Sequence, residues 1–136
     1  MSGFTLQLTD NTRRLQVPDV VSFVGVDASG SFGLLAGHAR FMTALVFGLA
    51  RFRSAGAAWQ YLAMPGALLY FDNNVLRLNT RRYLLGPDYA DMSRALEEQL
   101  AREERNLTEM KRTLHHIETQ VLKQMLEMNK PVENLA

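Results

Sequence analysis

Cysteine is absent from this sequence of 136 residues, so disulfide staples, thiolate metal sites and cysteine nucleophiles are excluded. No apolar run approaches the ~20 residues that a membrane-spanning helix needs. The first ten residues, MSGFTLQLTD, lack the basic region and apolar core of a secretory signal. From these absences we expect a cytosolic chain that meets a membrane only through other proteins.

The net charge of the chain is also small. Fifteen Lys and Arg against fourteen Asp and Glu leave a formal net charge of +1. Domains that bind nucleic acid or an anionic membrane surface usually carry a clear basic excess, so neither partner is expected here. Hydrophobic residues make up 47% of the chain, which is enough to bury a core without covalent staples.

Lysine and glutamate are missing from residues 1–86, and glycine is missing after Gly86. The first segment carries eight Arg and four Asp, whereas residues 87–136 carry seven basic and ten acidic side chains. Because Lys and Glu favour helices and Gly interrupts them, the GPD sequence at 86–88 indicates a boundary. We expect a β domain over residues 1–86 and a helical segment over residues 87–136.

The first segment is predicted to be an antiparallel β-sandwich or barrel, since it shows many short strand patterns separated by turns. FTLQLT at 4–9 alternates apolar and polar residues, the period of a half-buried strand. DNN at 72–74 favours a hairpin turn, because Asn and Asp tolerate left-handed backbone. The expected strands are 4–9, 13–17, 20–26, 31–35, 41–47, 49–53, 59–64, 67–71 and 75–80.

The second segment is predicted to be helical. Asp88 or Asp91 can cap its start, and Pro131 is expected to end it. One helix over the whole segment would be ~60 Å long, so the segment either folds back as a hairpin, with a break at 105–108, or extends as an arm. A coiled-coil-like seam, with steps of three and four residues, comprises Leu107, Met110, Leu114, Ile117 and Val121, with Met125 and Met128 extending the apolar side.

Candidate chemical residues are few. His38 has no second His, Cys or paired acid near it in sequence, so a packing or backbone-bonding role is favoured over that of a general base. His115 and His116 would point about 100° apart on a helix and cannot chelate one metal ion well. The glycines between residues 30 and 37 fit neither a nucleotide-binding loop nor a dinucleotide fingerprint. No catalytic constellation and no metal site is predicted.

The segment GSFGLLAGHARFMTAL at 30–45 carries a family resemblance. It resembles the pattern G-E-F-G-hydrophobic-L-P-G-H-A-P, then an apolar pair and T-A-L, of the epsilon subunit of F-type ATP synthases. RRLQ at 13–16 and PGALLYFDNNVLRLNT at 65–80 fall where that family has equivalents, so the resemblance covers essentially the whole chain. The matching residues are Gly30, Phe32, Gly33, Leu35, Gly37, His38, Ala39, Thr43, Ala44 and Leu45.

The resemblance implies a β-sandwich of about ten strands followed by an α-helical hairpin. It also implies a non-catalytic rotor subunit of the central stalk, peripheral to the cytoplasmic face of the bacterial inner membrane. The sandwich would bind the gamma subunit and the c-subunit ring, while the helices would reach the alpha/beta catalytic head and inhibit ATP hydrolysis. The implied contact loop for the c-ring and gamma comprises Ser31, Phe32, Gly33, Gly37, His38 and Arg40.

Residues 91–95, DMSRA, resemble the D-x-x-R-A motif that binds ATP in some members of the family. The resemblance implies Asp91 and Arg94 as ATP ligands, with no other cofactor, although Ala90 stands where the family prefers Ile or Leu. Elsewhere Ala36 and Arg40 replace two family prolines. Ser31 stands at the position where the family usually has an acidic residue. These departures are typical of a divergent branch, such as an alternative ATPase that pumps sodium, and the sequence leaves the coupling ion open.

Two other hypotheses remain. The chain could be a free-standing β-sandwich adaptor that homodimerises through the coiled-coil-like helix at 107–128, which predicts a dimer that is lost when that segment is deleted. It could also be a small enzyme that uses His38, which requires that His38→Ala abolishes turnover and leaves the fold intact.

Overall fold

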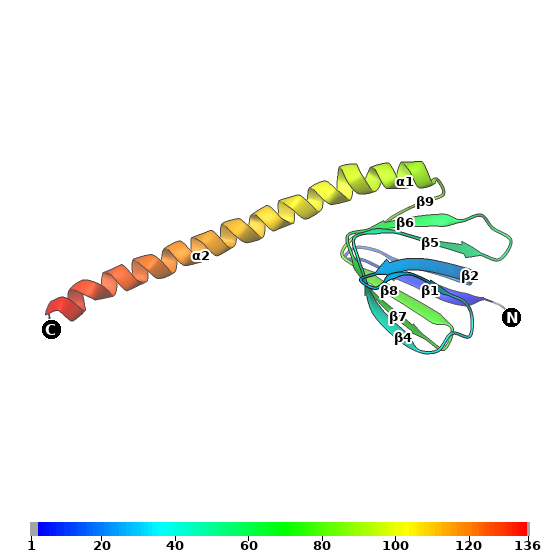
Figure 1. The fold of residues 1–136 in the computed structure, drawn as a ribbon, viewed down its shortest axis with the longest axis horizontal. Helices are drawn as coiled ribbons and strands as arrows, with labels where there is room; N and C mark the ends of the chain where they lie inside the picture. Colours follow the sequence, from blue (N-terminus) through cyan, green and yellow to red (C-terminus); the bar gives the residue numbers. More distant parts are fainter. Residues whose placement is uncertain (1–2, 136) are drawn as a thin grey trace. The chain divides into compact units, whose positions relative to one another are not determined.

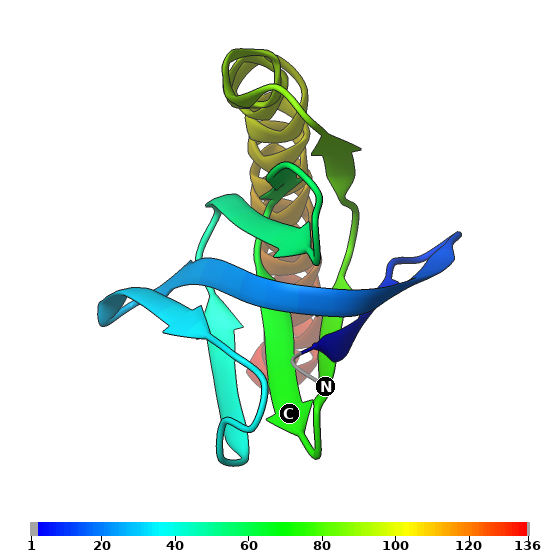
Figure 2. The ribbon, with the colours of Figure 1, turned by 90° about the vertical axis from the view of Figure 1, so that its right-hand side faces the viewer.

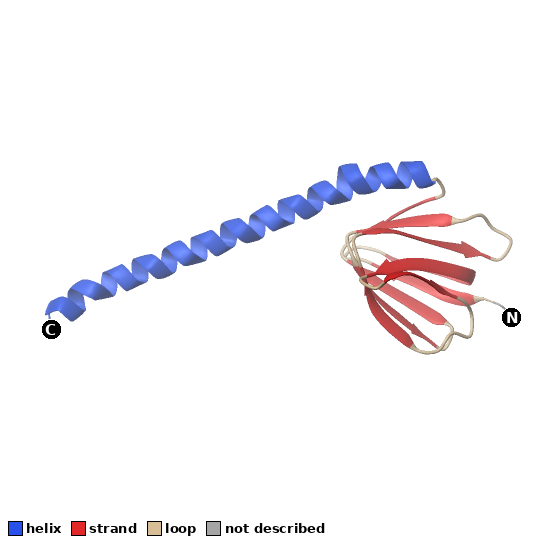
Figure 3. Cartoon of the chain, viewed as in Figure 1, coloured by secondary structure: helices blue, strands red, loops and turns tan. Residues whose placement is uncertain are grey.

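The computed structural model describes the backbone of residues 3–135 and the side chains of residues 3–127. The chain divides after Ala101 into two compact units, the first of strands and short helical segments and the second of helix alone (Figure 3). The described strands are β1 (Phe4–Thr9), β2 (Arg14–Asp27), β3 (Gly30–Leu34), β4 (Phe41–Leu45), β5 (Gly48–Ser54), β6 (Gln60–Met64), β7 (Ala67–Asp72), β8 (Val75–Thr80) and β9 (Leu84–Gly86). The helical elements are α1 (Tyr89–Ala95), the π-helical turn η1 (Leu96–Leu100) and α2 (Ala101–Leu135).

The strands form two layers that share the long strand β2 (Figures 1 and 2). One layer runs β1-β8-β7-β4, and the other runs β2-β5-β6-β9 with β3 added to β2. Among the described strands, every pairing is antiparallel except the parallel pair β1–β8. The predicted antiparallel β-sandwich is therefore confirmed, with nine strands described where about ten were expected.

The core lies between the two layers and follows from strand alternation. In β1 every second residue, beginning with Phe4, is buried, as the period of two in FTLQLT predicts. The rings of Phe4 and Phe71 meet edge to face with centroids 5.4 Å apart. Their strands, β1 and β7, both pair with β8, β1 in parallel and β7 antiparallel. Each such buried side chain contributes roughly 1.5–3 kcal/mol relative to an exposed one. The largest fully buried side chains are Phe4, Phe23, Phe71, Leu6, Leu8, Leu34, Leu62, Leu69, Leu76 and Leu78 in this core.

Pro18 and Asp19 do not separate two strands, as the expected strands at 13–17 and 20–26 would require. They lie inside β2, where Asp19 has a φ of 54°. In this part of β2 the pairing register shifts both against β1 and against β5. An extra residue in one strand bends that strand and increases its twist. The bulge therefore lets β2 pair with β1 along its first half and with β3 and β5 along its second half.

The strands end at Gly86, but the first compact unit continues to Ala101. Asp88 caps α1, as one of the two expected caps, because its side chain accepts a hydrogen bond from the backbone N–H of Asp91 at 3.0 Å. Met92 and Leu100 are buried in a second small cluster on the sandwich. A side chain at Gly86 would place a Cβ 2.8 Å from the sulfur of Met92, so the Met92 side chain would have to shift.

The described residues of the second unit are all helical, and α2 runs without interruption through residues 105–108. The hydroxyl of Thr108 donates to the carbonyl oxygen of Glu104 at 3.0 Å, so Thr108 lies inside the helix and does not cap a new one. The predicted break is therefore wrong, and the continuous alternative is the one found. The expected end at Pro131 is also wrong, since α2 extends to Leu135. The side chains of Met128 and Pro131 lie outside the described residues.

Candidate functional site

The loop at 35–40, between β3 and β4, is tied to the turn between β7 and β8. Gly37 has a φ of 81°, and its backbone N–H donates to Oδ1 of Asn74 at 2.7 Å. Asn73 and Asn74 have φ values of 51° and 58°, as in a two-residue type I′ hairpin turn, which confirms the turn predicted from DNN. Glycine adopts the left-handed conformation at Gly37 without a steric cost.

His38 is exposed yet held in place by the same part of the sandwich. Its Nδ1 lies 2.7 Å from the carbonyl oxygen of Ala39, a contact that requires a protonated Nδ1, since a carbonyl can only accept. Its ring meets those of Phe41 and Phe71 edge to face, with centroids 5.7 Å and 5.9 Å apart. These are packing and backbone contacts. Across the residues that the structure describes, no group of three His, Asp or Glu side chains could hold a metal ion.

Arg40 completes the loop with a weak ion pair. Its Nε lies 3.7 Å from Oδ1 of Asp72, and its side chain is largely exposed. An exposed pair of this kind contributes at most about 1 kcal/mol. The guanidinium is therefore largely in solvent, while the backbone beneath it is held by the contacts of Gly37 and His38 with the β7–β8 hairpin.

The three remaining predicted contact residues lie on β3 and point in alternate directions. Phe32 is half-buried, with its ring 5.3 Å from that of Phe41 in an edge-to-face arrangement. Ser31 and Gly33 lie on the outer face. Of the six predicted residues, Phe32 is half-buried and supports the loop from within, and the other five are exposed. Ser31 lines a surface cavity of about 230 Å³ with Val24, Val26, Leu49, Ala50, Arg51, Tyr61 and Tyr89.

Asp27 anchors β4 and was not predicted as a site residue. Its Oδ2 accepts a hydrogen bond from the hydroxyl of Thr43 at 2.8 Å, and its Oδ1 accepts from the hydroxyl of Ser29 at 2.6 Å. These hydrogen bonds, the one from the Ser29 hydroxyl first, hold the pKa of Asp27 below its usual value. The sequence feature that indicates this anchor is the threonine of the T-A-L sequence, for which sequence analysis predicts no hydrogen-bond partner.

Arg13 makes the second contact that sequence analysis missed. Its Nη2 donates to the carbonyl oxygen of Tyr83 at 2.7 Å and lies 3.2 Å from Oδ2 of Asp10. Its guanidinium carbon lies 4.2 Å from the centroid of the Tyr83 ring. These contacts join the β1–β2 turn to the segment that leads into β9. Because Arg13 and Tyr83 lie 70 residues apart, no local pattern connects them.

The outer face of β4 and β7 carries an exposed apolar patch, which we define as Met42, Ala44 and Leu68. Met42 and Leu68 are 70% and 63% exposed, and Ala44 is paired directly with Leu68. Contiguous exposed apolar side chains on a sandwich are typical of a protein interface. The patch follows the loop directly in the chain, since β4 begins at Phe41.

Asp91 and Arg94, the residues predicted to hold ATP, lie on one side of α1. Their Oδ1 and Nη1 atoms are 3.6 Å apart, and both side chains are largely exposed. This geometry is that of an exposed intrahelical ion pair. ATP binding at the pair stays a prediction.

Comparison with known proteins gives one family and several relatives. A family model described as the beta-sandwich domain of the ATP synthase Delta/Epsilon chain matches residues 3–84. The chain is 31% identical over 86 residues to an ATP synthase epsilon chain 2 of Cereibacter sphaeroides, which covers 62% of this chain and 59% of that one. The chain thus spans less than two thirds of that relative.

Two solved structures share the fold. A chain of the mitochondrial ATP synthase of Euglena gracilis, in an assembly of OSCP, F1 and c-ring, superposes with a TM-score of 0.56 and 25% identity, over 71% of this chain and 62% of that one. A chain of the central stalk and c-ring of the Tetrahymena thermophila mitochondrial ATP synthase superposes with a TM-score of 0.51 over 59% of this chain and 64% of that one, and at 9% identity it shows the fold alone. Because the family model matches more than half of its residues, the chain belongs to the ATP synthase delta/epsilon family through its β-sandwich domain.

Proposed function

We propose that the chain is a non-catalytic subunit of the central stalk of a rotary F-type ATP synthase, in which it couples the catalytic head to the c-ring. The observation that carries this proposal is the loop at 35–40, which is fixed to the β7–β8 hairpin and adjoins the apolar patch. A loop that is ordered before binding loses little entropy on docking. The Euglena relative, which belongs to an assembly with F1 and a c-ring, supports the same role.

The sandwich offers two surfaces of different chemistry. We assign the apolar patch of Met42, Ala44 and Leu68 to the gamma subunit, because a permanent interface is usually more apolar than the remaining surface. The loop and the outer face of β3 face the c-ring in this proposal. At that surface Ser31 supplies a hydroxyl where the family has an acid, so the contact rests on hydrogen bonds and on the positive charge of Arg40.

The helical unit would act on the alpha/beta head and inhibit ATP hydrolysis. Its support is the row of exposed apolar side chains on α2, which has no covering layer within its own unit. Asp91 and Arg94 would take ATP as a regulatory ligand. The subunit would lie peripherally at the cytoplasmic face of a bacterial inner membrane, with either protons or sodium as the coupling ion. In the part of the chain that the structure describes, no helix combines the length and apolar content needed to cross a membrane.

Co-expression with the gamma, alpha, beta and c subunits of the same organism tests the proposal. The full chain is expected to elute with gamma and the c-ring, and Leu68→Glu is expected to abolish this because it places a carboxylate in the apolar patch. Leu85→Glu is the matched control, since Leu85 is an exposed leucine on β9 in the other layer. Thermal unfolding of each variant establishes that the sandwich is folded.

The same preparations test the helical unit through ATP hydrolysis. Ile117→Asp, which disrupts the apolar row of α2, is expected to raise the hydrolysis rate of the assembled complex. Equal rates would keep the stalk role and leave α2 without inhibitory action. If the unmodified chain elutes without gamma and the c-ring, the stalk proposal fails and the free-standing adaptor takes its place. Turnover that is lost in His38→Ala alone would instead support an enzyme.

A further inference from the structure

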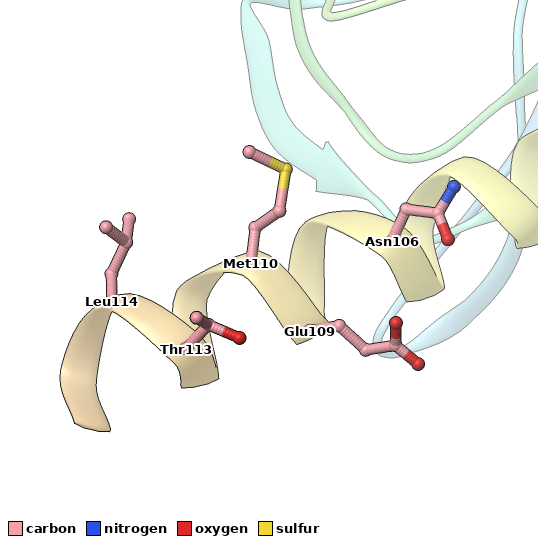
Figure 4. Close-up of a pocket in the computed structure, with 5 residues that line it drawn as sticks. All are labelled: Asn106, Glu109, Met110, Thr113 and Leu114. Carbon is pink, nitrogen blue, oxygen red and sulfur yellow. The ribbon is translucent and has the colours of Figure 1, made fainter. Parts of the chain in front are cut away.

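The exposed side of α2 follows a heptad-like pattern. Met110, Leu114, Ile117 and Val121 repeat at intervals of four, three and four residues and are 48–60% exposed. Figure 4 shows the side chains of Met110 and Leu114 projecting from the same side of the helix. We call these four residues, together with Leu107, the seam. A seam of this spacing packs best against a second helix, because each side chain can enter a hole on the facing surface.

The two flanks of the seam differ in charge. Lys111 and Glu118 lie on one flank, seven residues and about two turns apart, and both are exposed. Asn106, Thr113 and Gln120 lie on the other flank, which carries no charge at these positions. The opposite charges on a single flank discriminate between the two ways in which two copies of α2 can pair.

In a parallel pair, each flank meets the other flank of the partner. Lys111 would then face Asn106 of the second copy, and Glu118 would face its Thr113, so neither charge would find an opposite one. In an antiparallel pair, equal flanks meet. Lys111 then faces Glu118 of the second copy, and the reciprocal pair forms by symmetry, which gives two ion pairs.

The antiparallel register also aligns the apolar residues. With Leu114 opposite Ile117 of the second copy, Met110 lies opposite Val121, and Leu107 lies opposite Gln124. The overlap then covers residues 107–124, or about 27 Å of helix at ~1.5 Å per residue. The amide of Gln124 ends the apolar layers on each side.

We propose that the chain, when outside its complex, pairs with a second copy of itself through an antiparallel coiled coil of α2. The inference rests on α2 alone and does not depend on what the sandwich binds. The overlap is short and lies at the small end of protein interfaces, so the pair is weak and dissociates on dilution. The pair buries the seam, and so a paired chain cannot offer the same residues to any other partner.

Sedimentation equilibrium of the full chain alone, over a wide range of concentrations, tests the pairing. A monomer–dimer equilibrium is expected, and Ile117→Asp is expected to abolish the dimer because it places a charge in the central layer. Ile117→Asp is also expected to leave the thermal unfolding of the sandwich unchanged in dilute samples. A chain that is monomeric throughout would overturn the proposal, as would a dimer that survives Ile117→Asp. A monomer whose sandwich is destabilised by Ile117→Asp would overturn it too, since the seam would then be covered within one chain.

Charge exchange tests the antiparallel orientation. Lys111→Glu and Glu118→Lys each convert two ion pairs into two repulsions, which is expected to weaken the dimer about tenfold. The double variant Lys111→Glu with Glu118→Lys should restore it, and the two single variants should pair with each other when mixed. Glu109→Lys is the matched control, an equal charge change at an exposed position away from this flank. A dimer that is indifferent to the single changes at 111 and 118 would exclude the antiparallel arrangement.

Discussion

Leucine side chains are buried in the sandwich but exposed in the second unit. Leu69 and Leu76 in the sandwich have no exposed surface, whereas Leu114 and Leu122 on α2 are 58% and 62% exposed. Strand alternation places each sandwich leucine between two layers, but a helix alone has no second layer to cover its apolar side. The sandwich therefore supplies its own stability, and the apolar residues of α2 are available for binding.

The largest difference is expected from removing one apolar side chain in each unit. Phe71→Ala leaves a cavity beside Phe4 and should lower the free energy of unfolding by about 3–5 kcal/mol. Leu114→Ala removes a side chain that is already mostly in water, so a change within about 0.5 kcal/mol is expected. Thermal and denaturant unfolding of dilute samples measures both. Equal losses would contradict the contrast between the units.

The contrast also explains how far the fold could be predicted. The bounds of β1 and β8 agree with expectation to the residue, because alternation and the DNN turn are local signals. β9 was missed, since three residues are too few to show a period. The sequence predicts a gap between two strands at Asp19, because only the pairing of β2 with β1 and β5 shows that the strand continues.

In the helical unit, local signals predicted a helix break that the structure does not have. Asn106 and Thr108 can cap helices, but α2 continues through both residues. The hydroxyl of Thr108 donates to the carbonyl oxygen of Glu104 within the same helix. In the candidate site, the family pattern predicts Gly37 and His38 as contact residues, and their contact with a partner stays a prediction. The sequence could not identify Asn74 and Phe71, which they contact within the chain, because these contacts join segments more than 30 residues apart.

The loop should be more sensitive to a glycine substitution than the strand beside it. Gly37→Ala forces a side chain into left-handed backbone at a φ of 81°, which should cost about 1–2 kcal/mol and weaken binding to the c-ring. Gly33→Ala is the control for folding stability, because its Cβ would lie 3.7 Å from the nearest atom, the carbonyl oxygen of Phe23, in ordinary contact. Unfolding compares the two variants, and co-elution with the c-ring reports on Gly37→Ala. A greater loss for Gly33→Ala would contradict the assigned role of Gly37.

The start of α1, within the first unit, depends on its cap. Asp88→Ala removes the acceptor for the Asp91 backbone N–H and should cost about 1 kcal/mol of helix stability. Asp88→Asn keeps a capping oxygen and should remain close to the unmodified chain. Amide hydrogen exchange at Asp91 and Met92 measures the difference. Protection that is equal in both variants would show that the buried Met92, and not the cap, holds α1.

The smallest expected effect is a pH dependence that belongs to the sandwich. Hydrogen bonds from Ser29 and Thr43 lower the pKa of Asp27 in the folded chain, so their stabilisation is present above the unfolded pKa of about 3.9. It is lost as the pH falls through the lower, folded pKa. Thr43→Val should reduce the loss of stability on acidification, and Thr43→Ser should preserve it. Unfolding midpoints between neutral and acidic pH measure both, and identical profiles for the two variants would disprove the anchor.

Amide hydrogen exchange of the full chain alone, in dilute solution, tests the central contrast most directly. We expect strong protection in β1, β2, β7 and β8, whose amides lie in the paired core of the sandwich, and rapid exchange along residues 107–127 of α2, where the apolar seam is uncovered. Protection of α2 equal to that of the strands in the dilute monomer would contradict it, because the helix would then be stabilised within the chain itself.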